Sequence, residues 1–96
     1  MKILYTALAK EQLQNIKAYI AEENPKRAIA YLNRIRQKIE LLGRFPYIGK
    51  INATMDNESI REFVVLGYKV IYKINQKSIT ILALYKYIDF DEASLK

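Results

Sequence analysis

The sequence predicts an α+β domain in which a strand and a helical hairpin precede a three-stranded antiparallel meander. Three observations lead to this fold class: a short strand-like opening, two stretches with apolar residues at helical spacing, and a C-terminal half rich in β-branched and aromatic residues. Residues of the last kind fit a pleated, half-buried surface. A chain of 96 residues has room for one hydrophobic core. We therefore expect a single domain over residues 1–96.

The composition excludes several kinds of functional site. The chain contains no Cys and no His, which excludes disulfides, thiolate nucleophiles, histidine acid–base catalysis and the usual zinc sites. We expect no cofactor and no metal. No apolar run approaches the roughly 18 residues that a membrane span needs, and the opening residues are too few for a signal peptide. We therefore expect a cytoplasmic chain without a membrane partner.

The charge balance points to an anionic partner. The formal net charge is +6 and the pI is near 9.6. A basic chain of this kind is typical of proteins that bind nucleic acid, a nucleoprotein or an acidic protein. The alternative is a basic surface that keeps the chain in solution and has no such partner.

The N-terminal residues predict a short strand followed by a first helix. Residues 2–6 alternate, with Ile3 and Tyr5 on one side, and Thr6 can serve as the N-cap of the helix. Apolar residues then recur in steps of four, three and four, which places them on one face of a helix over residues 7–23. These residues are Ala9, Leu13, Ile16 and Ile20.

A second helix follows directly. Asn24 is a good N-cap, and Pro25 is preorganised for the first helical position. The apolar stripe of this helix consists of Ala28, Leu32, Ile35, Ile39 and Leu42. Gly43 stands where a helix C-cap is expected. The two helices form an antiparallel hairpin, and we expect both stripes to pack on one face of the sheet.

The outer side of the second helix is basic, with Lys26, Arg27, Arg34, Arg36 and Lys38. A solvated helix face explains this pattern, and a contact with nucleic acid is the functional alternative. Residues 51–59 have the composition of a loop, where we expect the highest mobility.

The predicted meander consists of strands over 60–66, 68–74 and 78–86, separated by Gly67 and by residues 75–77. Side chains alternate between the two faces of a strand, so the second strand divides into two sets. Tyr68, Val70, Tyr72 and Ile74 point to one face, and Lys69, Ile71 and Lys73 to the other. We expect the two tyrosines in the core and the lysines on the opposite face. The acidic tail over 88–96 predicts a short helical turn or a frayed end.

Five segments resemble the RelE/ParE superfamily of toxins in the order in which that superfamily carries them. The segment LQNIKAYIAEENP resembles the first helix and the Asn-Pro junction of ParE-type toxins. Residues 30–42 resemble the helix that follows. Phe45-Pro46 with Gly49-Lys50 resembles a "xPxxGR" turn. Residues 61–63 (REF) and 67–72 (GYKVIY) resemble the "REL…GYxxxY" core. The resemblance covers nearly the whole chain and is closer to the ParE type.

The resemblance implies the toxin of a type II toxin–antitoxin system, which inhibits bacterial growth. A cognate antitoxin would neutralise it in a hetero-oligomer. ParE-type members bind and poison DNA gyrase, which is the function we favour here. RelE-type members cut messenger RNA in the ribosome, so a ribosome-dependent endonuclease is the enzymatic alternative. An inactive relic that still binds an antitoxin is the third possibility.

Six residues of the meander are candidates for contact with the target or with the antitoxin: Arg61, Lys69, Lys73, Tyr85, Lys86 and Tyr87. Arg61 can instead form a surface ion pair with its neighbour Glu62, and the two lysines can simply keep the sheet in solution. Tyr85 and Tyr87 share a face and flank Lys86.

In the endonuclease alternative, the catalytic roles implied by the resemblance fall to Arg61, Lys69, Lys86 and Tyr87. These residues would activate the ribose 2′-hydroxyl, stabilise the charged phosphorane and protonate the leaving oxygen. The sequence departs from the family in having Tyr87-Ile88 where a basic pair is common. This departure weakens the ribonuclease interpretation most.

Overall fold

The computed structural model describes residues 1–87 and contains two helices, a short 3-10 helix and five strands. The elements are β1 (Lys2–Tyr5), α1 (Ala7–Ala21), α2 (Pro25–Glu40), η1 (Leu41–Gly43), β2 (Lys50–Ile51), β3 (Ile60–Val65), β4 (Tyr68–Ile74) and β5 (Ser78–Lys86). The predicted α+β class is confirmed. The prediction for the tail over 88–96 lies outside the described residues.

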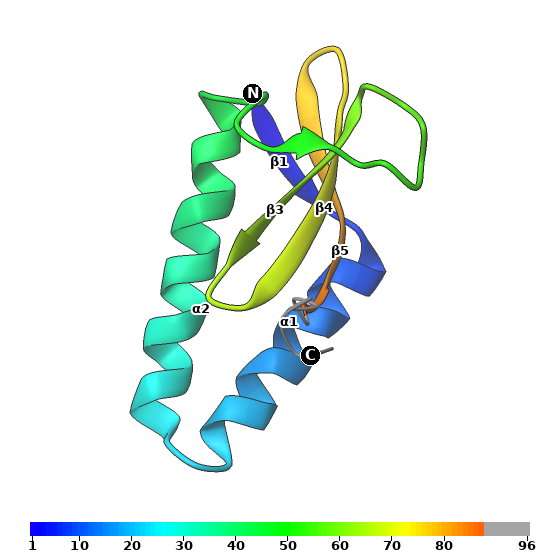
Figure 1. Cartoon of the computed structure of the whole chain (residues 1–96). Coiled ribbons are helices and arrows are strands. Elements are labelled where there is room, and N and C mark those ends of the chain that lie inside the picture. Colours follow the sequence, from blue (N-terminus) through cyan, green and yellow to red (C-terminus); the bar gives the residue numbers. More distant parts are fainter. Residues whose placement is uncertain (88–96) are drawn as a thin grey trace, which may run out of the picture.

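The strands form one sheet in the order β1-β5-β4-β3-β2 (Figure 1). Strands β3, β4 and β5 form the predicted antiparallel meander. β1 pairs in parallel with β5, from Lys2↔Ser78 to Tyr5↔Ile81, and so places the first and last strands side by side. β2 pairs antiparallel with β3 at the opposite edge. The loop prediction over 51–59 missed this edge strand, because two residues carry no periodicity.

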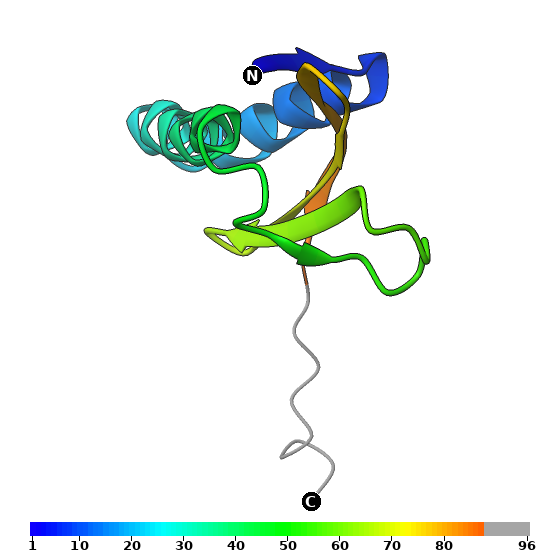
Figure 2. The ribbon, with the colours of Figure 1, turned by 90° about the horizontal axis from the view of Figure 1, so that it is seen from above.

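Both helices cover the same face of the twisted sheet, as Figure 2 shows. The predicted N-caps are present: the Thr6 hydroxyl accepts a hydrogen bond from the Ala9 amide at 3.0 Å, and the Asn24 side chain accepts one from the Arg27 amide at 3.1 Å. Each cap satisfies an amide that the first helical turn leaves without a partner. None of the described helices is long and apolar enough to cross a membrane.

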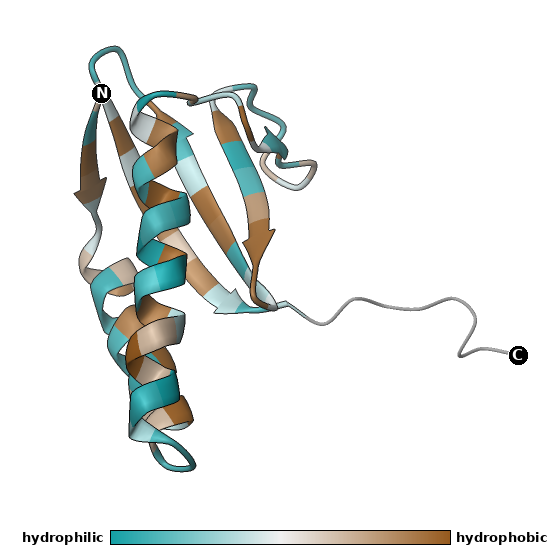
Figure 3. Cartoon of the chain, turned by 90° about the vertical axis from the view of Figure 1, so that its left-hand side faces the viewer, coloured by the Kyte–Doolittle hydropathy of each residue, from teal (hydrophilic) through white to brown (hydrophobic). Residues whose placement is uncertain are grey.

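The core lies between the helices and the sheet. The predicted stripes fill it, and Tyr68 and Tyr72 join them at 5% and 0% exposure. In Figure 3, α2 is nearest the viewer and exposes hydrophilic residues over much of its outer side. This arrangement agrees with a solvated basic face.

Gly43 has a different role from the predicted C-cap. The regular turns of α2 end at Glu40, Leu41 is the C-cap, and η1 follows. Among the described glycines only Gly67 has a positive φ. At Gly43 a Cβ would lie 2.8 Å from the Met1 carbonyl oxygen, and the Met1 ammonium donates a hydrogen bond to the Gly43 carbonyl. The glycine is needed because the N-terminus of the chain passes close to it.

The turn between β3 and β4 sets the register of the meander. Leu66 and Gly67 have φ angles of 51° and 81°, and Val65 pairs with Tyr68 across the turn. Two successive residues with positive φ are typical of a type I′ hairpin turn, whose twist matches that of the strands. Leu66 accepts this conformation although it is not a glycine, and its side chain packs against the core.

We expect Leu32→Ala to lower the free energy of unfolding by on the order of 2–4 kcal/mol, because Leu32 is 5% exposed within the core and its removal leaves a cavity. Urea denaturation measures the change. The matched control is Ile29→Ala on the same helix, where the side chain is 55% exposed. A loss below about 1 kcal/mol for Leu32→Ala would mean that the stripe does not face the core.

Candidate functional site

The face of the sheet that turns away from the helices carries four of the six candidate residues. We call this the outer face. Lys69 lies opposite Tyr85, and Lys73 opposite Thr80. Residues paired in this way lie on the same side of a sheet, and alternation along the chain adds Tyr87. The outer face therefore brings together Lys69, Lys73, Tyr85 and Tyr87. Alternation predicted each pair, and the register of β4 with β5 joins the two pairs.

A nearly buried ion pair occupies the middle of the outer face. The Lys69 ammonium lies 2.8 Å from a carboxylate oxygen of Glu62, and the two side chains are 19% and 7% exposed. The Asn52 amide donates a hydrogen bond to the other Glu62 oxygen at 3.2 Å. The ammonium also lies 4.6 Å from the centre of the Tyr87 ring, a distance at which a cation and an aromatic face attract each other. Glu62 thus holds Lys69 in place.

This arrangement decides the charge state of Lys69. The hydrogen bond with Glu62 raises the pKa of Lys69 above its ordinary value, although partial desolvation opposes the shift. The amine therefore stays protonated at neutral pH and cannot accept a proton. Its positive charge is balanced by a carboxylate within contact distance, so little of it is left to stabilise an anion.

Arg61 and Lys86 lie on the other side of the sheet, toward the helices. Arg61 is opposite Tyr72, and its Nη1 donates a hydrogen bond to the Gly49 carbonyl at 3.0 Å. Its guanidinium lies 4.8 Å from the centre of the Tyr47 ring. The suggested ion pair of Arg61 with Glu62 is not formed, because neighbouring residues of a strand point to opposite faces.

The Lys86 ammonium lies 5.2 Å from the centre of the Tyr68 ring, also on the side of the helices. The four residues that the endonuclease alternative requires are thus divided: Lys69 and Tyr87 lie on the outer face, and Arg61 and Lys86 on the inner one. Lys73 is exposed. It forms no ion pair within residues 1–87, where the one ion pair is that of Lys69 with Glu62.

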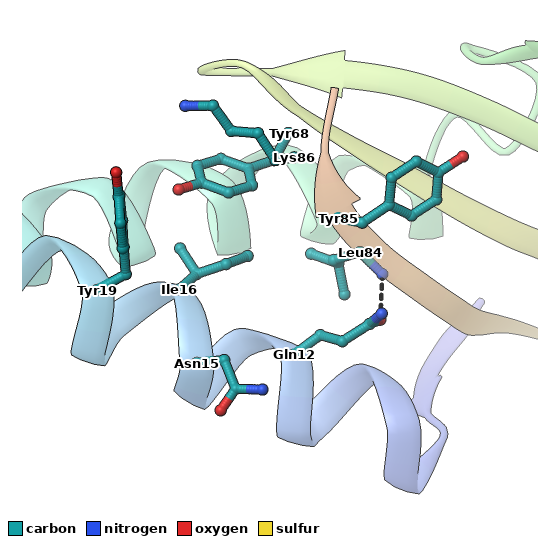
Figure 4. A pocket seen from close by; sticks show the side chains of 8 residues that line it. All are labelled: Gln12, Asn15, Ile16, Tyr19, Tyr68, Leu84, Tyr85 and Lys86. Atoms are coloured by element: carbon teal, nitrogen blue, oxygen red, sulfur yellow. Dashed lines mark hydrogen bonds between the residues drawn. The ribbon is translucent and has the colours of Figure 1, made fainter. Parts of the chain in front are cut away.

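A groove between α1 and the end of β5 is a second candidate surface (Figure 4). It has a volume of about 440 Å³, and its lining is largely apolar. The lining residues are Gln12, Asn15, Ile16, Tyr19, Tyr68, Leu84, Tyr85 and Lys86. Tyr19 is 68% exposed at its rim. Two predicted residues, Tyr85 and Lys86, border this groove.

The groove exists because β1 is shorter than β5. Pairing with β1 ends at Ile81, and Leu82 forms a bulge in β5. Beyond that point, side chains bind the backbone groups at the free edge of β5. The hydroxyl of the N-cap Thr6 donates to the Leu82 carbonyl at 3.0 Å, and the Gln12 side chain accepts from the Leu84 amide at 2.6 Å. Sequence reasoning missed the helical side of the groove, although Gln12, Ile16 and Tyr19 follow a helical spacing.

We expect the Glu62–Lys69 pair to contribute about 1–2 kcal/mol of coupling energy, because each partner leaves the other partly buried and uncompensated when it is removed. A double-mutant cycle with Glu62→Gln and Lys69→Met, followed by urea denaturation, measures it. Glu58→Gln, at an exposed position, is the matched control. Additive effects of the two substitutions would show that the contact contributes nothing.

The same pair has a definite pH dependence. Because folding raises the pKa of Lys69, its contribution is fully present below the ordinary value of 10.5 and is lost as the pH rises through the higher folded value. The difference in stability between the wild type and Lys69→Met should therefore be constant near neutrality and shrink above pH 10.5. A difference that shrinks already near pH 8 would contradict the raised pKa.

Comparison with solved structures identifies relatives of the fold. The chain is similar to the chromosomal ParDE toxin–antitoxin system from P. aeruginosa, with a TM-score of 0.76 and 18% identity over 92% of this chain and 97% of that one. The isolated E. coli RelE toxin has a TM-score of 0.66 at 11% identity, over 98% of this chain and 92% of that one. The RelBE2 toxin–antitoxin complex from Mycobacterium tuberculosis has a TM-score of 0.58 at 17% identity, over 92% of both chains.

Comparisons of the sequence identify the family of the chain. A search of curated proteins found no match. A family model describing the ParE toxin of the type II toxin–antitoxin system parDE matches residues 3–86, from β1 to the end of β5. This range contains both helices, all of the sheet except Lys2, and every predicted site residue except Tyr87. The chain belongs to the ParE family of type II toxins.

Proposed function

We propose that this ParE-family chain is a cytoplasmic toxin that arrests bacterial growth by binding DNA gyrase and that a cognate antitoxin neutralises it. The observation that carries the choice of a binding mechanism is the contact of Lys69 with Glu62 at 2.8 Å. Because Glu62 neutralises Lys69, the most central cation of the outer face is not available for catalysis.

Cleavage of RNA requires a base for the 2′-hydroxyl, positive charge at the phosphorane and an acid for the leaving oxygen. These groups must surround one phosphate. Here Lys69 is protonated and balanced by a carboxylate, while Arg61 and Lys86 contact Tyr47 and Tyr68 on the other face of the sheet. This distribution favours inhibition by binding over catalysis.

The α1–β5 groove is the surface that we assign to the antitoxin. Its apolar lining, with Tyr19 and Tyr68, suits the apolar side of an amphipathic segment. Lys86 at its rim supplies a cation for an acidic residue of that segment, and the net charge of +6 attracts an acidic partner over longer distances.

The ribosome-dependent endonuclease remains the second candidate. The Tyr87 ring lies against the Lys69 ammonium, and exposed Lys73 shares their face. A substrate phosphate that displaced Glu62 from Lys69 would meet all three groups. An inactive relic would retain only the antitoxin groove.

The two mechanisms differ in their response to Lys69→Ala. In an inhibitor, affinity is spread over several contacts, so we expect toxicity to weaken by about tenfold. The purified wild type should reduce gyrase supercoiling and leave ribosome-bound messenger RNA intact. Codon-positioned cleavage by the wild type, abolished in Lys69→Ala, would establish the endonuclease instead. Inactivity in both assays with tight antitoxin binding would identify the relic.

The antitoxin assignment predicts that Lys86→Glu weakens binding of the antitoxin encoded beside this chain by about tenfold at low salt, because a repulsion replaces an attraction. Raising the salt concentration should weaken wild-type binding and reduce the difference between the two proteins. Lys77→Glu changes the net charge equally at the exposed turn between β4 and β5 and serves as the control. Equal effects of the two substitutions would contradict a specific contact at the groove.

A further inference from the structure

Large apolar side chains are exposed on the segment that follows η1 and ends with the short strand β2. We call residues 44–51 (RFPYIGKI) the docking loop. Phe45 is 56% exposed, Tyr47 67%, Ile48 46% and Ile51 45%. Phe45, Tyr47 and Ile48 line one shallow hollow. Exposed apolar side chains that gather in this way on a soluble protein mark a site of interaction.

The backbone of the docking loop is fixed to the sheet. The hydroxyl of fully buried Tyr72 donates a hydrogen bond to the Pro46 carbonyl at 2.7 Å and accepts one from the Gly49 amide at 3.0 Å. Arg61 donates to the Gly49 carbonyl at 3.0 Å. A Cβ at Gly49 would lie 2.6 Å from the Glu62 carbonyl oxygen, so only glycine allows this close approach.

A fixed backbone with exposed apolar side chains is preorganised for binding. A flexible loop loses conformational freedom when it is captured, and that loss lowers affinity. Here the loss has already occurred on folding, because the core tyrosine and Arg61 hold the loop. The Arg61 guanidinium also stacks on the Tyr47 ring at 4.8 Å, which limits the rotation of an aromatic side chain of the type that often anchors interfaces.

The charges of the docking loop indicate the kind of partner. The loop carries Arg44 and Lys50, both exposed, and no acidic residue. A second copy of the chain would bring like charges together around the apolar surface. Nucleic acid would satisfy the cations but leave Phe45 and Ile48 in water. A protein with an apolar pocket and an acidic rim would bury the apolar side chains of the loop and pair with its two cations.

The docking loop and the α1–β5 groove lie at opposite ends of the sheet. In Figure 1 the loop lies beside the N-terminus, whereas the end of β5 lies at the other end against α1. One surface can therefore be occupied while the other stays free. We infer that the docking loop is the surface with which this toxin binds its target protein, apart from the groove that we assign to the antitoxin. This inference rests on the proposed function and adds the location of the target contact.

The test compares growth arrest with antitoxin binding in the same variants. Phe45→Ser with Ile48→Ser removes two apolar side chains, and Arg44→Glu with Lys50→Glu reverses the flanking charge. We expect each pair to raise the induction needed for growth arrest by about tenfold or more. The affinity for the antitoxin should stay within about twofold of the wild type. Leu8→Ser with Ile29→Ser, at helix positions 51% and 55% exposed, is the matched control and should leave growth arrest unchanged.

Three outcomes overturn the inference, and a fourth overturns only the proposed target. Loop variants that arrest growth like the wild type show that the loop is not a contact. Loop variants that lose affinity for the antitoxin but still arrest growth identify the antitoxin as the partner that binds the docking loop. Thermal unfolding verifies that the variants are folded, and the charge pair decides if the serine pair does not fold. A wild type that arrests growth without inhibiting gyrase refutes the proposed target while the loop variants still test the surface. A wild type without any toxicity refutes both.

Discussion

The buried hydroxyl of Tyr72 links the two parts of this structure on which function depends. Its ring belongs to the core, where it packs 6.0 Å from the ring of Phe63. Its hydroxyl reaches through the core to the carbonyl of Pro46 and the amide of Gly49. A buried hydroxyl needs such partners, and here the partners are the backbone of the segment that leads to β2. One side chain of β4 thereby stabilises the core and positions a loop that precedes it by more than twenty residues.

The helices and the meander could be predicted because their signals are local. The three-four spacing of Leu13, Ile16 and Ile20, the caps at Thr6 and Asn24, and the alternation along β4 each depend on a few neighbouring residues. The edge strand β2 and the role of Gly43 depend on distant parts of the chain. β2 forms where Gly49 is held against β3 and Tyr72, and Gly43 lies against Met1. No spacing within the sequence reports such contacts.

The candidate site was predictable to the same extent. Alternation placed Lys69 and Lys73 on one face and grouped Tyr85 with Tyr87. It could not show that Glu62, from the neighbouring strand, reaches Lys69, because that contact depends on the register of the Leu66–Gly67 turn. Nor could it show that Arg61 turns toward the helices and contacts Gly49. The chemical character of the outer face therefore follows from strand pairing more than from composition.

The parallel pairing of β1 with β5 also constrains when the protein can fold. Lys2–Tyr5 pairs with residues Ser78 to Ile81, so the first strand finds its partner only after those residues have been synthesised. The helical hairpin is synthesised early, before the strands that it will cover. Contacts between residues this distant in sequence also form slowly. The native core, and with it the surfaces described above, can be completed only when β5 has emerged from the ribosome. A nascent chain that stops before β5 therefore lacks the strand that joins β1 to β4, and it has no α1–β5 groove.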